Sequence, residues 1–194
     1  MTHVLLFHHI QGLTDGVVAF ADDLRASGHT VDTPDLFDGH TFDTIEEGFA
    51  HAKELGDTPD AKADRAADAL PGALVYAGFS WGVGSAQRLA QTRAGARGAL
   101  LYEACFPIFG DYAFGPWPDR VPVQIHGKED DQFFAHEGDI DAAREFVATV
   151  GPELGELFVY PGREHLFLDR SLPTYDAGAA ALVLQRTLHF LSML

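Results

Sequence analysis

The residues best suited to chemistry in this sequence form the pentapeptide Gly78-Phe79-Ser80-Trp81-Gly82, a G-x-S-x-G pattern. It follows the apolar run 73–77 and precedes an amphipathic stretch that begins near Val83. Between a strand and a helix, this pattern is typical of a sharp turn that exposes a nucleophilic serine. The alternative is a glycine-rich turn in which Ser80 only caps the helix. A dinucleotide-binding loop fits less well, because Gln87 stands where its third glycine would be.

A serine nucleophile needs a histidine base, and the base needs a carboxylate that fixes its tautomer. Asp130 and Asp131 follow the apolar run 121–126, and His165 follows the run 157–160. A single histidine or aspartate in a loop is usually just solvated. Here, however, the chain order is Ser, Asp, His, each after its own strand, which is the order of α/β-hydrolases. We therefore expect acyl transfer from these residues, with no cofactor, and either aspartate could be the acid.

Alternating strands and helices must position these groups, and their order along the chain predicts an α/β fold. A mostly parallel central sheet with helices on both faces would place the reactive loops beyond the carboxyl ends of its strands. We expect one domain over residues 1–194. The expected strands are 4–7, 30–33, 73–77, 99–102, 121–126 and 157–160, and the expected helices are 17–24, one opened by a capping box at Thr44, 58–70, 83–93, 139–150 and 174–194.

Charge and cysteine content exclude several classes of protein. The chain of 194 residues has 13 Lys and Arg against 29 Asp and Glu, a net charge of −16. Nucleic acids and anionic membranes would repel such a chain, so we expect neither as a partner. Cys105 is the single cysteine, which excludes an internal disulfide and a multi-cysteine zinc cluster. The N-terminal sequence is unlike a secretory signal, so a cytoplasmic location is the default expectation.

The chain resembles the dienelactone hydrolase family of α/β-hydrolases over nearly its whole length. The matching segments are the Gly78 to Gly82 turn, His126-Gly127 followed by Asp130, residues 160–162 ahead of residues 165–167, and the final helix. The resemblance implies a compact domain without a large lid. It makes Ser80 the nucleophile, His165 the general base and acid, and Asp130, three residues after the family's glycine, the orienting acid. It also places an oxyanion between the backbone N–H groups of Ile10 and Trp81.

The departures from that family bear on the substrate. Members that cleave dienelactone carry a cysteine nucleophile, and this chain has Ser80. They have a glutamate in the oxyanion loop, where His9 stands here, and their arginine for the substrate carboxylate is matched by Asp169, with Arg170 one position away. We therefore expect a small ester or thioester other than dienelactone as the substrate.

The irregular segment 105–120 is rich in aromatic residues and could overhang the site. We expect His9, Phe109 and Trp117 to contact an uncharged, hydrophobic acyl group, although the rings could instead simply pack the loop onto the core. Glu103 also follows a strand, and its role is open. The protein could be a monomer or a homodimer.

Two other functions remain open from the sequence. One is a non-catalytic protein of the hydrolase fold that binds a ligand or partner. The other is a metal-assisted hydrolase that uses clusters of histidine and aspartate. We expect no metal, because no two of the histidines weighed as ligands (His8, His9, His126, His136 and His165) have the i, i+4 spacing of a helical metal site.

Overall fold

The computed structural model describes residues 1–70 and 72–194 and contains a six-stranded sheet. The strand order is β2-β1-β3-β4-β5-β6, and every pairing between these strands is parallel. The α/β prediction with a mostly parallel sheet is confirmed. The strands are β1 (His3–Phe7), β2 (Thr30–Asp32), β3 (Val75–Phe79), β4 (Gly98–Tyr102), β5 (Val123–Lys128) and β6 (Gly155–Tyr160).

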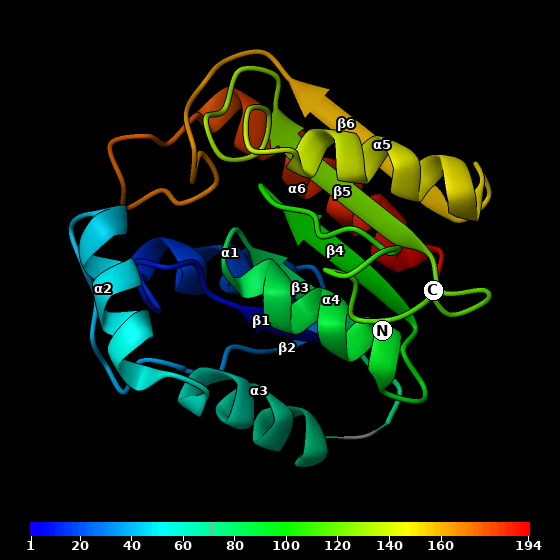
Figure 1. The fold of residues 1–194 in the computed structure, drawn as a ribbon, viewed down its shortest axis with the longest axis horizontal. Coiled ribbons are helices and arrows are strands. Elements are labelled where there is room, and N and C mark those ends of the chain that lie inside the picture. Colours follow the sequence, from blue (N-terminus) through cyan, green and yellow to red (C-terminus); the bar gives the residue numbers. More distant parts are fainter. Residues whose placement is uncertain (71) are drawn as a thin grey trace.

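Helices cover both faces of this sheet, as Figure 1 shows. They are α1 (Asp15–Ala26), α2 (Ile45–Leu55), α3 (Thr58–Asp68), α4 (Gly82–Thr92), α5 (Asp139–Val150) and α6 (Ala177–Ser192). Side chains alternate across each strand. Leu5 and Phe7 of β1 therefore join a core with α3, α4 and α5 on one face, while Val4 and Leu6 join a core with α1 and α6 on the other. Two buried faces explain why the central strands are continuous apolar runs.

Most expected helices begin and end within a few residues of their predicted limits. Helix α5 spans the predicted residues 139–150, and Thr44 caps α2 in a complete capping box with Glu47. Strands β3 and β5, however, each begin and end two residues later than predicted. The final helix begins at Ala177 instead of residue 174, because Asp176 caps it by accepting hydrogen bonds from Gly178 and Ala179.

The strand order reverses direction between β1 and β3, which is where ligands bind in open parallel sheets. The chain leaves β1 toward β2 on one side, and β3 lies on the other side. The segment after Phe7 and the turn after Phe79 therefore meet at this point. In Figure 1 these carboxyl ends lie on the left, next to α2 and the loop that follows β6.

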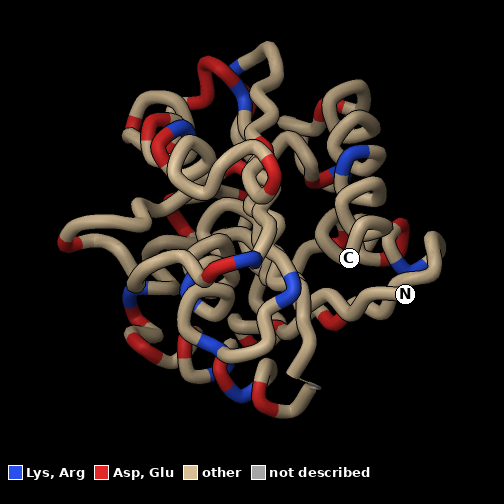
Figure 2. Tube along the Cα trace, turned by 90° about the vertical axis from the view of Figure 1, so that its right-hand side faces the viewer, with Lys and Arg blue, Asp and Glu red and all other residues tan. Residues whose placement is uncertain are grey.

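Acidic residues are distributed over the whole chain, with fewer basic ones among them (Figure 2). This spread is typical of a solvated surface, because the acidic residues do not gather on one face. No helix in the described residues is long and apolar enough to cross a membrane.

Candidate active site

The turn between β3 and α4 holds Ser80 in a left-handed backbone conformation, with φ at +47°. This conformation is costly for a residue with a side chain. A Cβ atom on Gly78 would lie 2.4 Å from the carbonyl oxygen of Gly82, and one on Gly82 would lie 2.4 Å from that of His8. Only glycine fits at either position, so both glycines of the motif are explained by close backbone packing.

Ser80 begins a chain of hydrogen bonds through His165. Ser80 Oγ lies 2.7 Å from His165 Nε2, and His165 Nδ1 lies 2.7 Å from Asp131 Oδ2. A carboxylate can only accept, so Nδ1 carries the proton that faces Asp131. Nε2 is then free to accept the proton of the Ser80 hydroxyl, which is the arrangement a general base requires.

Asp131, and not Asp130, is the acid that contacts His165, so the prediction of Asp130 is wrong. Beyond β5, residues 129 and 130 form a turn, in which the N–H of Asp130 donates to the carbonyl oxygen of Gly162. Asp130 is exposed in this turn, with its carboxylate 2.9 Å from His136 Nε2, while the Asp131 side chain is completely buried.

Asp131 also shapes the turn that follows β5. Its Oδ1 accepts hydrogen bonds from the backbone N–H groups of Phe133 at 2.9 Å and Phe134 at 3.4 Å. An aspartate that bonds the backbone two residues on is a common turn signal. That signal distinguishes Asp131 from Asp130.

Lys128, a residue that the sequence analysis did not identify, holds the loop that carries His165 in place. Lys128 Nζ lies 2.6 Å from Glu164 and 2.8 Å from Asp176, and its side chain is 1% exposed. Next to His165, Leu166 has φ at +58°, and the Phe133 ring lies 4.6 Å from the His165 ring. These contacts fix where the imidazole sits before any ligand arrives.

Nearby negative charge favours the protonated form of His165. Burial alone would lower the pKa of His165, but the hydrogen bond to Asp131 and the charges of Glu103 and Asp131 raise it above its ordinary value. Glu103 follows β4, next to the Ser80 turn, and burial raises its pKa to about 7. Neither carboxylate oxygen of Glu103 has a hydrogen-bond partner in the described residues, although the amides of Phe167 and Leu168 approach it.

The backbone N–H groups of Ile10 and Trp81 lie in loops that pack together. The turn at Gly82 lies against the carbonyl of His8, and Gly48 of α2 lies against the carbonyl of Ile10. Neither the Ile10 nor the Trp81 N–H donates a hydrogen bond within the described part of the chain. Both donors are thus free for a ligand oxygen, as an oxyanion site would require.

His9 does not line the site, so its expected contact with substrate is wrong. The side chain is buried, and both ring nitrogens have partners within the protein. His9 Nε2 lies 2.7 Å from Asp169 Oδ2, and Nδ1 accepts the N–H of Gln11 at 3.2 Å. This pair joins the loop after β1 to the loop after β6. Arg170 points away from the site, toward Asp23 on α1.

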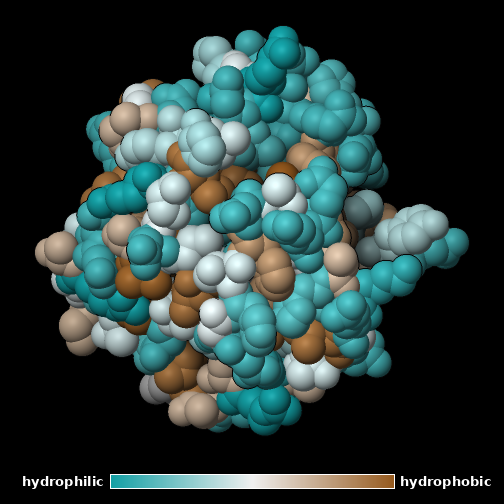
Figure 3. Space-filling model, turned by 90° about the vertical axis from the view of Figure 1, so that its left-hand side faces the viewer, coloured by the Kyte–Doolittle hydropathy of each residue, from teal (hydrophilic) through white to brown (hydrophobic). Residues whose placement is uncertain are grey.

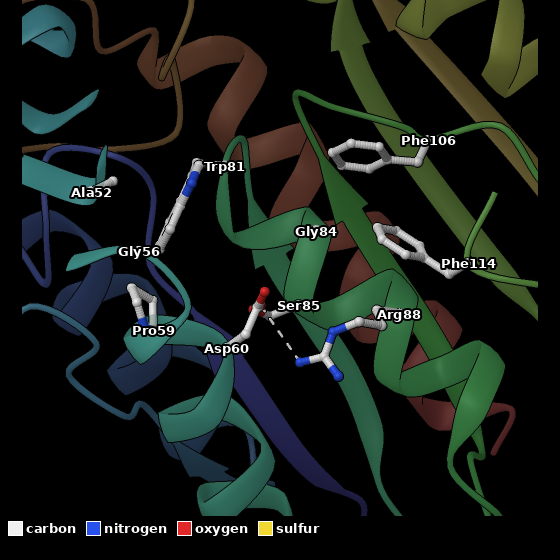
Figure 4. A pocket seen from close by; sticks show the side chains of 10 residues that line it. All are labelled: Ala52, Gly56, Pro59, Asp60, Trp81, Gly84, Ser85, Arg88, Phe106 and Phe114. Carbon is white, nitrogen blue, oxygen red and sulfur yellow. Dashed lines mark ion pairs between the residues drawn. The ribbon is translucent and has the colours of Figure 1, made fainter. Parts of the chain in front are cut away.

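Trp117 also fails to line the site, whereas the expected contact of Phe109 with substrate stays a prediction. Trp117 packs on Phe146 of α5 with its ring 4.6 Å away and donates to the carbonyl oxygen of Val121, while Phe109 is exposed. Their segment instead contributes Phe106 and Phe114. These rings line a cleft of about 240 Å³ that begins at Trp81, the neighbour of Ser80 (Figure 4). From the side where the strands end, the surface shows small hydrophobic patches among hydrophilic side chains (Figure 3).

Cys105, His8 and His126 are buried inside the fold. Burial raises the pKa of the Cys105 thiol well above its ordinary range, which makes a thiolate nucleophile unfavourable. Burial also lowers the pKa of His8 to about 4 and that of His126 to about 3, so both rings are neutral near pH 7.

Comparisons with known proteins agree with this fold. A protein from Klebsiella pneumoniae subsp. pneumoniae assigned as a dienelactone hydrolase is similar with a TM-score of 0.76 and 17% identity, over 100% of this chain and 88% of that one. A dienelactone hydrolase-like promiscuous phosphotriesterase from metagenomic libraries is similar with a TM-score of 0.74 and 18% identity, over 100% of this chain and 87% of that one. A structure from a study of the metagenome-derived lipolytic enzymes LipS and LipT is similar with a TM-score of 0.60 and 18% identity, over 100% of this chain and 94% of that one.

No curated protein matches the chain in sequence. The sequence model of the dienelactone hydrolase family, however, matches residues 1–194, the full extent of the chain. With that match and the α/β-hydrolase fold, the chain belongs to the dienelactone hydrolase family, a family of hydrolases.

Proposed function

We propose that this protein is a serine hydrolase that cleaves a small ester or thioester through an acyl-enzyme. The observation that carries the proposal is the unbroken path from Ser80 Oγ through His165 to Asp131, with 2.7 Å at each contact. A serine in a strained turn, a histidine in the base tautomer and a buried carboxylate together support nucleophilic chemistry. A purely structural site needs none of these to coincide.

Acylation begins when Ser80 Oγ attacks the carbonyl carbon and its proton moves to His165 Nε2. The negative charge that develops on the carbonyl oxygen is stabilised by the Ile10 and Trp81 N–H groups. Losing one such donor typically costs about 2.7–4 kcal/mol of transition-state stabilisation. The C–O or C–S bond then breaks, and His165 returns the proton to the leaving alcohol or thiol.

Deacylation repeats these steps with water as the nucleophile. His165 Nε2 takes a proton from water while the water oxygen attacks the acyl carbon, and the same two N–H groups stabilise the new oxyanion. The bond to Ser80 Oγ breaks, and the proton on His165 returns to the serine. Asp131 keeps its hydrogen bond to Nδ1 throughout and stabilises the imidazolium that forms in each half of the reaction.

The test is hydrolysis of p-nitrophenyl acetate and butyrate by the wild type and by Ser80→Ala, with folding checked by circular dichroism. We expect activity in the wild type and a loss of at least about 10⁴-fold in the variant. Activity that survives in folded Ser80→Ala contradicts the proposal. A wild type that neither turns over these esters nor reacts at Ser80 with a fluorophosphonate favours a non-catalytic binding protein.

A further inference from the structure

We infer that the cleft beside Trp81 binds the acyl group of the substrate and selects a short chain whose far end carries an uncharged hydrogen-bonding oxygen. This inference rests on the proposed function and names the substrate class for that site. The cleft is smaller than the 300–1,000 Å³ of sites for drug-sized ligands. It therefore suits a compact acyl chain.

The position of the cleft relative to His165 indicates which part of an ester it receives. His165 must protonate the leaving group, so the leaving group lies on the side of the His165 loop. The lining of the cleft includes Trp81 but no residue of the His165 loop, and its walls come mainly from α2, α3, α4 and the segment after β4. The acyl group is therefore the part directed into the cleft.

The walls of the cleft are apolar and held in place. Phe106 and Phe114 face Ala52 and Pro59 across it, as Figure 4 shows. Gln87 of α4 clamps Phe106 by bonding its backbone N–H at 2.9 Å and its carbonyl oxygen at 2.8 Å. Such a wall exists before binding, so an apolar chain loses little free energy in ordering it.

The far end of the cleft is polar and contains Ser85, Asp60 and Arg88 (Figure 4). Arg88 Nη1 donates to Asp64 at 2.8 Å, but Nη2 is 3.5 Å from Asp60 and has no hydrogen-bond partner among the described residues. A buried donor without an acceptor is unfavourable. The Arg88 side chain as a whole is 23% exposed, so a small movement of the guanidinium would let an oxygen at the end of the acyl chain supply that acceptor.

The charges at this end favour a neutral oxygen over a carboxylate. Two carboxylates, Asp60 and Asp64, share the single positive charge of Arg88. An anionic chain end would meet net negative charge, whereas a ketone or hydroxyl oxygen accepts from Nη2 without repulsion. Helix residues 81–88 span about 10 Å at about 1.5 Å per residue, and the arginine side chain leans back toward Trp81. A chain of about six carbons therefore reaches it.

The test measures binding, so that it does not depend on turnover. Ser80→Ala is titrated calorimetrically with methyl hexanoate, methyl 5-oxohexanoate and monomethyl glutarate, which match in length and differ at the chain end. We expect the oxo ester to bind about tenfold more tightly than the hexanoate, because a hydrogen bond to a charged group is at stake. The anionic ester should bind no better than the hexanoate.

Two further variants, each made in Ser80→Ala, separate the cleft from general effects. Arg88→Met should abolish the preference for the oxo ester. Arg93→Met is the matched control, because Arg93 pairs with Asp68 of α3 as Arg88 does with Asp64 but lies outside the cleft. It should keep the preference.

Equal binding of the three esters, tightest binding of the anionic one, or an unchanged preference in Arg88→Met would overturn the inference. The proposed function fails separately. A wild type that hydrolyses none of these esters, together with an intact binding preference, leaves a selective binding cleft without the proposed chemistry. Hydrolysis without any preference among the esters supports the proposed function and shows that the cleft does not determine its specificity.

Discussion

Two buried histidine–aspartate pairs lie on neighbouring loops of this protein, and only one of them faces a nucleophilic side chain. His165 with Asp131 and His9 with Asp169 both have nitrogen–oxygen distances of 2.7 Å. Both pairs are almost completely shielded from solvent. By residue type, distance and burial they are nearly the same.

The two pairs differ in the group that faces the second ring nitrogen of the histidine. His165 directs Nδ1–H to its aspartate and leaves Nε2 facing the hydroxyl of Ser80. His9 directs Nε2–H to its aspartate, and its Nδ1 accepts the backbone N–H of Gln11. A backbone amide does not give up its proton, whereas a serine hydroxyl does when it attacks a carbonyl. A His–Asp pair therefore indicates a base only when its other nitrogen faces a nucleophile.

The His9 pair has its own use, which is to hold two loops of the site together. Asp169 accepts hydrogen bonds from His9, Thr14 and Ser171, and it lies next to the first turn of α1. Burial alone would raise the pKa of Asp169, but these bonds outweigh burial and hold it at about 2. The pair thereby places the Ile10 N–H relative to the His165 loop.

The largest effect expected from this comparison is on turnover. Asp131→Asn should lower kcat by about 10⁴-fold, because an amide no longer selects the tautomer in which Nε2 accepts the serine proton. Initial rates on p-nitrophenyl butyrate would measure it. Asp130→Asn is the matched control, and its rate should stay within about twofold of the wild type. Similar losses in both variants would contradict the assignment of Asp131.

Breaking the other pair should cost stability more than activity. Asp169→Ala leaves the His9, Thr14 and Ser171 donors without their acceptor, and removing one partner of a buried pair costs about 3–5 kcal/mol. Urea unfolding would measure this loss. The kcat of the folded variant should fall far less than that of Asp131→Asn, and a loss of kcat as large as in Asp131→Asn would show that both pairs act in catalysis.

The same variant makes a pH prediction. Because the pKa of Asp169 is about 2 in the folded protein and about 3.9 in an unfolded chain, its stabilisation is complete above about pH 4. It fades as the pH falls toward 2. The difference in unfolding free energy between wild type and Asp169→Ala should therefore be smaller at pH 3 than at pH 7, and a constant difference would contradict the ionised pair.

A smaller effect is expected on the pH dependence of the rate. The pKa of His165 is raised above its ordinary 6.5, so kcat/KM should fall as the pH drops through a midpoint above 6.5. Ionised Glu103 contributes to that increase, and Glu103→Gln should move the midpoint to lower pH. Glu153→Gln is the control, because Glu153 precedes β6 and so lies at the opposite, amino end of the strands. A midpoint that stays in place in Glu103→Gln would rule out its charge as a cause.

The smallest effect is expected at Arg170, one position after Asp169. Its guanidinium pairs with Asp23 on the surface, and exposed pairs of this kind contribute about 0.2–1 kcal/mol. Arg170→Ala should lower the free energy of unfolding by no more than this and leave the rate on p-nitrophenyl butyrate unchanged. A lowered rate would place Arg170 in the site, against the contacts seen here.

Much of the site was predictable because its signals are local. The glycines around Ser80 report a turn between adjacent elements, and the order of Ser80 and His165 after their strands predicts that they meet at one sheet edge. The errors arose where a side chain's direction depends on the exact turn that the chain makes. The turn at residues 129 and 130, with its hydrogen bond from the Asp130 N–H to Gly162, decides which aspartate faces inward.

The sequence by itself determined the α/β class, the turn at Ser80 and the loops that carry the acid and the base, because hydrophobic periodicity and turn residues act over a few neighbouring positions. Only the tertiary structure decided which of several similar groups became partners. Asp131 over Asp130, the enclosed His9, and Phe106 in the cleft in place of Trp117 all depend on contacts between segments far apart in the chain. Those contacts follow from strand register and packing, which no local pattern records.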